Sequence, residues 1–248
     1  MTERSEGARA AESGEPARAA ESGEPARAAE SGEQARAAES GMQGERRELD
    51  QPVADTRLER QIAFLLEADR LKQIERMTKI LGGSRRENSA EHSWHLALFA
   101  LVLVEHADEP LDIGRAITML LLHDLVEIDA GDTFAYDDAG YETKAAREEA
   151  AADRLFALLP KGQGEWLRSL WDDFEAGESP EARFANAVDR LQPLLLNHAN
   201  EGGPWREHGI SRERIRLRNS PIGDGSAVLW AFAQDRIDEA HALGLLAD

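Results

Sequence analysis

Over most of its length, the chain repeats apolar residues with the three- and four-residue spacing of amphipathic helices. In "RLERQIAFLLEADRLKQIERMTKIL" this spacing places Leu58, Ile62, Leu65, Ile74 and Met77 on one stripe, with charged residues opposite. The alternation that is typical of strands is not convincing anywhere in the chain. The pattern therefore predicts an all-α fold, a single helical bundle of about seven to nine helices.

Several helix boundaries carry the expected capping and breaking residues. Asn88 followed by Glu91 has the form of a capping box, which predicts that a helix begins there. Gly131 suits a left-handed C-terminal cap of a third helix that contains "MLLLHDLVEIDA". Pro160 predicts the end of a helix, and Pro180 stands where a first helical turn tolerates proline.

The N-terminal part of the chain has a different composition. The nine-residue unit "ARAAESGEP" occurs at 8–16 and 17–25, and drifted copies follow it. Because Gly and Pro occur in most copies, a helix cannot continue from one unit to the next, and no unit can bury a core. We therefore expect a disordered tail over 1–52 and a folded domain over 53–248. Met42, just after the last copy, could be the true start of translation.

The chain is strongly acidic, with 48 Asp and Glu against 29 Lys and Arg, a net charge of −19, and no cysteine. Because this charge repels phosphate backbones, we expect no nucleic-acid partner. A small phosphorylated ligand is compatible with it, since local arginines and a metal can reverse the field inside one pocket. The longest apolar run, 96–104, is about half of the ~20 residues that a membrane span needs. We expect a cytoplasmic protein without membrane contact or disulfides.

Ionisable residues interrupt two otherwise apolar segments. His92 stands near the start of "EHSWHLALFALVLVEHA", and His123 and Asp124 follow "MLLL" in the third predicted helix. Burying an imidazole or a carboxylate is costly unless each group finds a partner. A divalent metal would satisfy all of them, because it accepts imidazole nitrogen and carboxylate oxygen together. On spacing alone, hydrogen bonds to neighbouring helices explain these residues equally well.

Further acidic residues favour the metal. Glu127 lies four residues after His123, and therefore on the same face of the predicted helix, and Asp132 follows just past the helix end. Asp189 interrupts another apolar face in "FANAVDRLQPLLLN". Such a concentration of ionisable groups in apolar surroundings is typical of a functional site. His95 fits either an outer contact of this site or a position in the core.

A His on one helix, a His-Asp pair on the next and a distant Asp resemble the H…HD…D signature of the HD-domain metal-dependent phosphohydrolases. Within that superfamily the chain is similar to the branch of 5′-deoxynucleotidases. Four segments carry the resemblance: "LKQIER" (71–76), "ENSAEHS" (87–93), "HDLVEIDAGD" (123–132) and "AVDRLQ" (187–192). The resemblance implies an all-α fold and one divalent metal with four ligands, namely His92, His123, Asp124 and Asp189.

The residues themselves agree with a single metal. Superfamily members with two or three metals carry extra histidines between the His-Asp pair and the last Asp, and this chain has none between Asp124 and Asp189. Two imidazoles and two carboxylates leave Mn, Co, Fe, Mg and Zn open. The expected chemistry is hydrolysis of a phosphate ester by a water whose pKa the metal lowers from ~16 toward neutrality.

The resemblance implies roles for three more residues. Glu127 would manage the proton of the attacking water or orient it, and Asp132 would assist the leaving sugar oxygen or contact the sugar. Arg76 would contact the substrate. Met77 stands where relatives carry a tryptophan that helps to discriminate the sugar, so the preference between deoxyribose and ribose is open.

The sequence supports more than one function. A phosphohydrolase of nucleoside 5′-monophosphates is the leading interpretation, so the expected partner is a small phosphorylated substrate, a nucleotide. A hydrolase of another small phosphoester and a non-catalytic metal and nucleotide sensor are the alternatives. Relatives indicate a homodimer. Arg85 and Arg86, in the loop before His92, fit either phosphate contacts or solvated charges.

Overall fold

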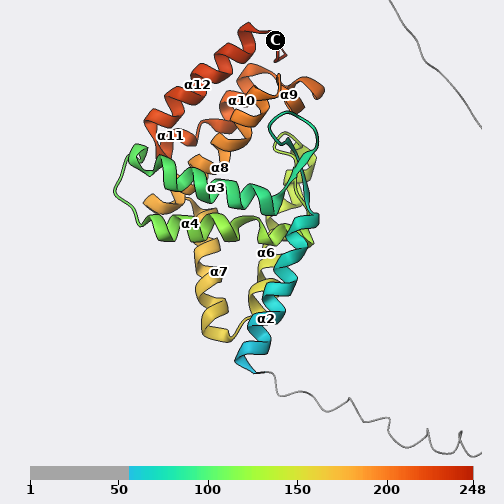
Figure 1. Cartoon of the computed structure of the whole chain (residues 1–248), viewed down its shortest axis with the longest axis vertical. Helices are drawn as coiled ribbons and strands as arrows, with labels where there is room; N and C mark the ends of the chain where they lie inside the picture. Colours follow the sequence, from blue (N-terminus) through green and yellow to red (C-terminus); the bar gives the residue numbers. More distant parts are fainter. Residues whose placement is uncertain (1–55, 248) are drawn as a thin grey trace, which may run out of the picture. The chain divides into compact units, whose positions relative to one another are not determined.

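A computed structural model of the chain describes residues 56–247 (Figure 1). The predicted tail over 1–52 and the alternative start Met42 lie outside the described residues. The described part is mostly helical, which confirms the predicted all-α class, although it also contains one two-stranded sheet. No helix within this part is both long enough and apolar enough to cross a bilayer.

The first helix is shorter than the apolar pattern predicts. The segment consists of α2 (Arg57–Ala68), the 3₁₀ helix η1 (Asp69–Gln73), β1 (Glu75–Lys79) and β2 (Arg86–Asn88). The backbone becomes extended at Ile74, and β1 pairs antiparallel with β2 across a turn in which Gly82 and Gly83 have positive φ. The prediction of a helical stripe through Met77, with no strands, is therefore wrong. Pairing with a segment beyond the turn determines this backbone, and helical periodicity does not report such pairing.

The predicted apolar stripe is also not the face that packs on the core. Leu58, Ile62 and Leu65 are 65%, 46% and 61% exposed, whereas Phe64 of the same helix is only 7% exposed. The ring of Phe64 packs on that of Phe156, with centroids 6.5 Å apart. α2 therefore has apolar residues on more than one face, and the neighbouring helix that covers one of them decides which face is core.

α3 (Ser89–Leu103) begins at the predicted capping box. The side chain of Asn88 accepts a hydrogen bond from the backbone N of Glu91 at 3.0 Å, and the Glu91 carboxylate accepts one from the backbone N of Asn88 at 3.3 Å. Both halves of the box are formed, which fixes the first turn of the helix, where His92 lies. The chain continues in the 3₁₀ helix η2 (Val104–His106).

The third predicted helix is interrupted at its polar residues. It is divided into α4 (Ile113–Leu122), the 3₁₀ helix η3 (His123–Val126) and α5 (Glu127–Ala130). His123 and Asp124 therefore begin a tighter turn, and their predicted place in the middle of one α-helix is wrong. Gly131 does end the segment, but with φ 73° and ψ 152° it lies outside the left-handed helical region.

The remaining helices agree with the predicted boundaries. Pro160 is the N-cap of α7, and Pro180 is the first residue of α8. The C-terminal part consists of α6 (Asp138–Ala157), α7 (Lys161–Ala176), α8 (Pro180–Ala199), α9 (Gly203–Glu207), α10 (Arg212–Asn219), α11 (Ile222–Gly225) and α12 (Ala227–Ala242).

α8 is the central helix of the bundle. It packs against α3, α4, α7, α11 and α12, and its residues Phe184, Ala185, Val188 and Leu191 are buried. α3 and α4 lie side by side across the middle of Figure 1, with α10, α11 and α12 on one side of them and α6 and α7 on the other. This packing brings α3, the junction of α4 with η3, and α8 together.

Candidate metal centre

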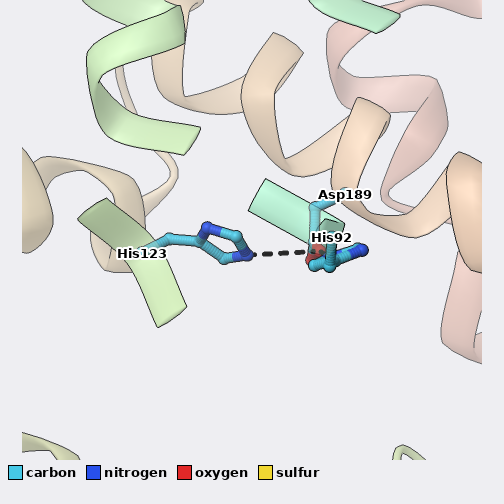
Figure 2. A group of neighbouring side chains, drawn as sticks. All are labelled: His92, His123 and Asp189. Carbon is cyan, nitrogen blue, oxygen red and sulfur yellow. Dashed lines mark hydrogen bonds and ion pairs between the residues drawn. The ribbon is translucent and has the colours of Figure 1, made fainter. Parts of the chain in front are cut away.

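Two imidazoles and a carboxylate converge where these three elements meet. His92 of α3, His123 of η3 and Asp189 of α8 each offer one ligand atom, and these atoms all lie within 4.8 Å of one another. Asp189 Oδ1 lies 3.0 Å from His92 Nε2 and 3.5 Å from His123 Nε2. Figure 2 shows the three side chains pointing toward one another. The structure thus brings together three of the four predicted metal ligands.

The imidazole of His123 is held with Nε2 facing this point. Its Nδ1 lies 2.8 Å from the carbonyl oxygen of Leu120, which can only accept, so Nδ1 carries a proton. Trp171 Nε1 donates to the backbone oxygen of His123 at 3.2 Å and supports the turn. The buried Nε2 has no hydrogen-bond partner of good geometry within residues 56–247. A ligand nitrogen in such a position is expected of a metal site.

The electrostatic field at the centre favours a cation. Burial opposes a charge on His123, but the carboxylates of Asp124 and Asp189 outweigh it and raise the pKa of His123 to about 9. Burial also opposes the charge on Asp189, yet the nearby imidazoles of His123 and His92 hold the pKa of that carboxyl well below its usual range. The same field that retains a proton on an imidazole would retain a metal cation in its place.

Residues behind His92 orient its ring. His92 Nδ1 lies 3.2 Å from Gln192 Oε1, and Gln192 Nε2 donates to Glu87 Oε1 at 2.8 Å and lies 3.1 Å from His95 Nδ1. Gln192, Glu87 and His92 are all buried. Because Gln192 accepts from Nδ1, Nε2 of His92 is left facing Asp189. The half-buried His95 is therefore an outer contact of the site. This is one of the two positions that the sequence predicts for it.

Gln192 and Glu87 received no role from the sequence, although both lie in the segments that resemble the family. The spacing of Gln192 was a usable signal, because it stands three residues after Asp189 and so on the same face of α8. Glu87 lies in β2, one residue before the N-cap of α3. Nothing in the local sequence pattern there distinguishes a buried acid from a solvated one. The burial of Glu87 depends on the pairing of β2 with β1.

Asp124, the fourth predicted ligand, is adjacent to the group but not part of it. Its Oδ1 lies 3.1 Å from His123 Nε2, whereas its Oδ2 accepts a hydrogen bond from Arg76 Nη1 at 2.6 Å. Arg76 reaches this position from β1, and its side chain is only 14% exposed. Burial opposes the guanidinium charge, but Asp124 and the other nearby acids raise the pKa of Arg76. Asp124 thus links the three ligands to the predicted substrate arginine.

Two further predicted acids lie beside Asp124. Glu127 is buried and accepts a hydrogen bond from Ser89 Oγ at 2.6 Å. Burial and the neighbouring charge of Asp124 raise the pKa of Glu127 to about 8. Burial also raises the pKa of Asp132, against the opposing effect of Arg76. Both carboxyls therefore keep a proton to a higher pH than exposed acids do.

A cavity of about 310 Å³ opens onto these groups. Asp124, Glu127, Asp132 and Asp189 line it, together with Met77 and aromatic side chains of the surrounding helices. Its cationic lining residues are Arg76, Lys144, Arg190 and Arg218. Of the four, only Arg76 could be predicted from the sequence. The other three lie on α6, α8 and α10 in polar surroundings that resemble ordinary exposed helix faces in sequence.

Two arginines that had a predicted alternative role do not line the cavity. Arg85 forms two hydrogen bonds of 2.7 Å to the carboxylate of Glu91, and the side chains of both residues are exposed. Arg86 is exposed as well. Both are therefore surface charges and not phosphate contacts of this cavity.

Comparison with known proteins agrees with this geometry. The family model described as HD domain matches residues 68–230, which include all seven predicted site residues. The chain belongs to the HD-domain family. A crystal structure of a predicted metal-dependent phosphohydrolase from Magnetospirillum magnetotacticum MS-1 is 50% identical, with a TM-score of 0.76 over 79% of this HD-domain chain and 99% of its own. A conserved hypothetical protein from Pyrococcus furiosus, 21% identical with a TM-score of 0.53, shares the fold.

Curated relatives of this HD-domain protein include 5′-deoxynucleotidase HDDC2 of Bos taurus, 31% identical over 54% of this chain and 64% of its own length. The Homo sapiens protein of the same name is 30% identical over 54% of this chain and 65% of its own length. The matched region thus spans less than two thirds of either relative.

Proposed function

We propose that this HD-domain protein is a metal-dependent phosphohydrolase that releases phosphate from nucleoside 5′-monophosphates. The observation that carries the proposal is the convergence of His92, His123 and Asp189 on one point beside a cavity that holds both acids and cations. The names of the curated relatives, 5′-deoxynucleotidases, support this substrate class.

The residues fit one divalent metal. Two imidazole nitrogens and a carboxylate oxygen form a donor set that transition metals bind, and the unpartnered Nε2 of His123 supplies one of these donors. Asp124 would complete the set, with Oδ1 already 3.1 Å from that nitrogen. Once bound there, the metal would supply Lewis-acid chemistry, polarising a phosphoryl oxygen and lowering the pKa of water.

The surrounding side chains would divide the remaining work. Arg76 is always charged and would contact the phosphate while keeping Asp124 in position. Glu127, which Ser89 holds by a hydrogen bond, would orient the attacking water and exchange its proton, because a carboxyl with a raised pKa can do so near neutral pH. Asp132 would assist the leaving oxygen or contact the sugar.

The choice between deoxyribose and ribose depends on the lining of the cavity. Met77 lines it, at the position where the family resemblance implies a tryptophan. A methionine side chain is flexible and fills space less rigidly than an indole does. We therefore expect weaker exclusion of the 2′-hydroxyl than a tryptophan would give, so deoxyribonucleotides and ribonucleotides should be compared side by side.

Phosphate release from deoxynucleoside and ribonucleoside 5′-monophosphates, with Mn²⁺, Co²⁺ or Mg²⁺ added, tests the proposal. Glu127→Gln should lower kcat by about a hundredfold or more, the range of a lost acid or base, while metal content stays unchanged. Glu165→Gln, an exposed acid of α7 outside the cavity, is the matched control. A metal-loaded protein that releases no phosphate from any nucleotide would refute hydrolysis and leave the sensor alternative.

A further inference from the structure

Most arginines of residues 56–247 have a carboxylate partner within salt-bridge distance. This is expected in a chain with a net charge of −19, where each guanidinium has many acids to choose from. Two arginines of the cavity differ. Neither Arg190 nor Arg218 forms an ion pair with a carboxylate of the described residues. Both line the cavity that contains the candidate metal centre.

Arg190 follows the predicted ligand Asp189 on α8 and is held by a neutral partner. Its Nη1 lies 3.4 Å from the backbone oxygen of Arg218, a long contact, and its buried Nε has no partner within the described part of the chain. No hydrogen bond joins it to Asp189, because that carboxylate is directed at His92 and His123. The hydrogen-bond partner of Arg190 among the described residues is thus a neutral backbone oxygen, and no carboxylate bonds its guanidinium.

Arg218, near the end of α10, is also positioned without being neutralised. Its guanidinium carbon lies 5.8 Å from the ring centroid of Tyr141, and Lys144 Nζ lies 5.9 Å from the same centroid. A cation over an aromatic face gains electrostatic energy, but the ring carries no net charge. Lys144 differs, because Glu148 accepts a hydrogen bond from it at 2.6 Å. Of the four cations that line the cavity, only Arg190 and Arg218 therefore lack a hydrogen-bonded carboxylate among the described residues.

Two guanidinium groups without carboxylate partners that line one cavity repel each other, and an anion bound between them would offset this repulsion. Guanidinium groups match the oxygens of phosphate with paired, charge-assisted hydrogen bonds. We propose that Arg190 and Arg218 form a phosphate subsite for the nucleotide in the cavity that also holds the candidate metal centre. This inference rests on the proposed function for the identity of the ligand, but the subsite itself follows from the unpaired charges.

The phosphate in question could be the scissile group or a second phosphate of the same nucleotide. Arg76 already shares its charge with Asp124 at 2.6 Å, so it cannot alone balance a phosphate dianion. If the scissile phosphate lies between the metal and Arg190, every substrate depends on the subsite. If a second phosphate occupies it, nucleotides that carry two phosphates gain affinity from it and monophosphates do not.

Equilibrium binding of inorganic phosphate to the Mn²⁺-loaded protein, measured by calorimetry, is the first test. Arg190→Gln and Arg218→Gln should each weaken binding about tenfold, the loss expected for a charge-assisted contact. Arg206→Gln, an exposed arginine outside the cavity, should leave binding unchanged. Arg190→Lys should recover part of the loss. The Mn²⁺ content and the unfolding transition of each variant must equal those of the wild type, which separates the subsite from damage to Asp189.

Steady-state kinetics then distinguish whether the scissile phosphate or a second phosphate of the nucleotide occupies the subsite. A rise of about tenfold in KM for deoxyadenosine 5′-monophosphate in both variants would assign the subsite to the scissile phosphate. A rise confined to deoxyadenosine 3′,5′-bisphosphate would assign it to a second phosphate. The subsite is refuted if both variants match the wild type and Arg206→Gln in phosphate binding and in both KM values. The calorimetry needs no turnover, so it remains decisive even if no nucleotide is hydrolysed.

Discussion

Replacing Gln192 by leucine should weaken metal binding although Gln192 touches no metal. The side chain is buried, and it contacts His92, Glu87 and His95 at 3.2, 2.8 and 3.1 Å. Leucine fills a similar volume and offers no hydrogen bond, so Nδ1 of His92 and Oε1 of Glu87 both lose their partner. The ring of His92 would then be free to rotate, or to present a different tautomer toward Asp189.

The size of the loss in stability can be worked out from the two buried groups that lose their hydrogen-bond partner. Each buried polar group without a partner costs about 1–3 kcal/mol, so the loss of partners by two groups should lower the free energy of unfolding of the metal-free protein by roughly 2–6 kcal/mol. Glu87 Oε2 already lies 3.4 Å from His92 Nδ1 and can take over part of the orienting contact. We therefore expect the loss in metal affinity at about tenfold, the lower end of the range of about 10–100-fold for residues that orient a ligand.

The assay is Mn²⁺ binding by calorimetry, at a temperature where urea denaturation shows the variant to be folded. Gln163→Leu is the matched control, because Gln163 also bonds a side-chain amide, that of Gln61 at 2.7 Å, but lies on α7 outside the cavity. Binding within twofold of the wild type by folded Gln192→Leu would show that the orientation of His92 does not depend on this contact, and the reasoning would fail.

Three further predictions concern the residues that position the candidate ligands and the N-terminal repeats. Trp171→Phe removes the donor to the His123 carbonyl and should lower the free energy of unfolding by about 1–3 kcal/mol in urea titrations, with a smaller effect if η3 is held by other contacts alone. Asn88→Ala breaks the capping box of α3 and should cost about 1 kcal/mol in the same assay; an unchanged midpoint would show that the cap is dispensable. A chain beginning at Met42 should bind Mn²⁺ and release phosphate like the full chain, and a tenfold loss of activity would show that the repeats contribute.

Local patterns marked His123, Asp124 and Asp189 as unusual, but it was the family resemblance that joined them with His92 as one set of predicted ligands. His123 and Asp189 interrupt apolar faces, and a buried charge without a partner is too costly to be retained by packing alone. The position of Arg76 depended on the family resemblance, and its geometry depends on the β1–β2 pairing that helical periodicity concealed. The break of the third helix at His123 was likewise invisible, because a 3₁₀ turn and an α-helix share nearly the same sequence signals.

The polar residues that surround the predicted ligands were harder to predict from the sequence. Arg190 and Arg218 look like the solvated face of a helix in sequence, and only the structure shows that they meet. Gln192 shares a face with Asp189, but its contact with His92 depends on the packing of α8 against α3. The same limit explains the error at α2, whose stripe of Leu58, Ile62 and Leu65 is exposed. Periodicity identifies a face, but the neighbouring element decides whether that face is covered.

The number of divalent metal ions per chain tests the central claim most directly. Elemental analysis of protein reconstituted with Mn²⁺ and freed of excess metal should find one equivalent in the wild type. It should find almost none in Asp189→Asn, a nearly isosteric change that removes the charge shared by His92 and His123. A wild type without stoichiometric metal, or an Asp189→Asn variant that retains a full equivalent, would contradict the assignment of these three residues as the centre of the site.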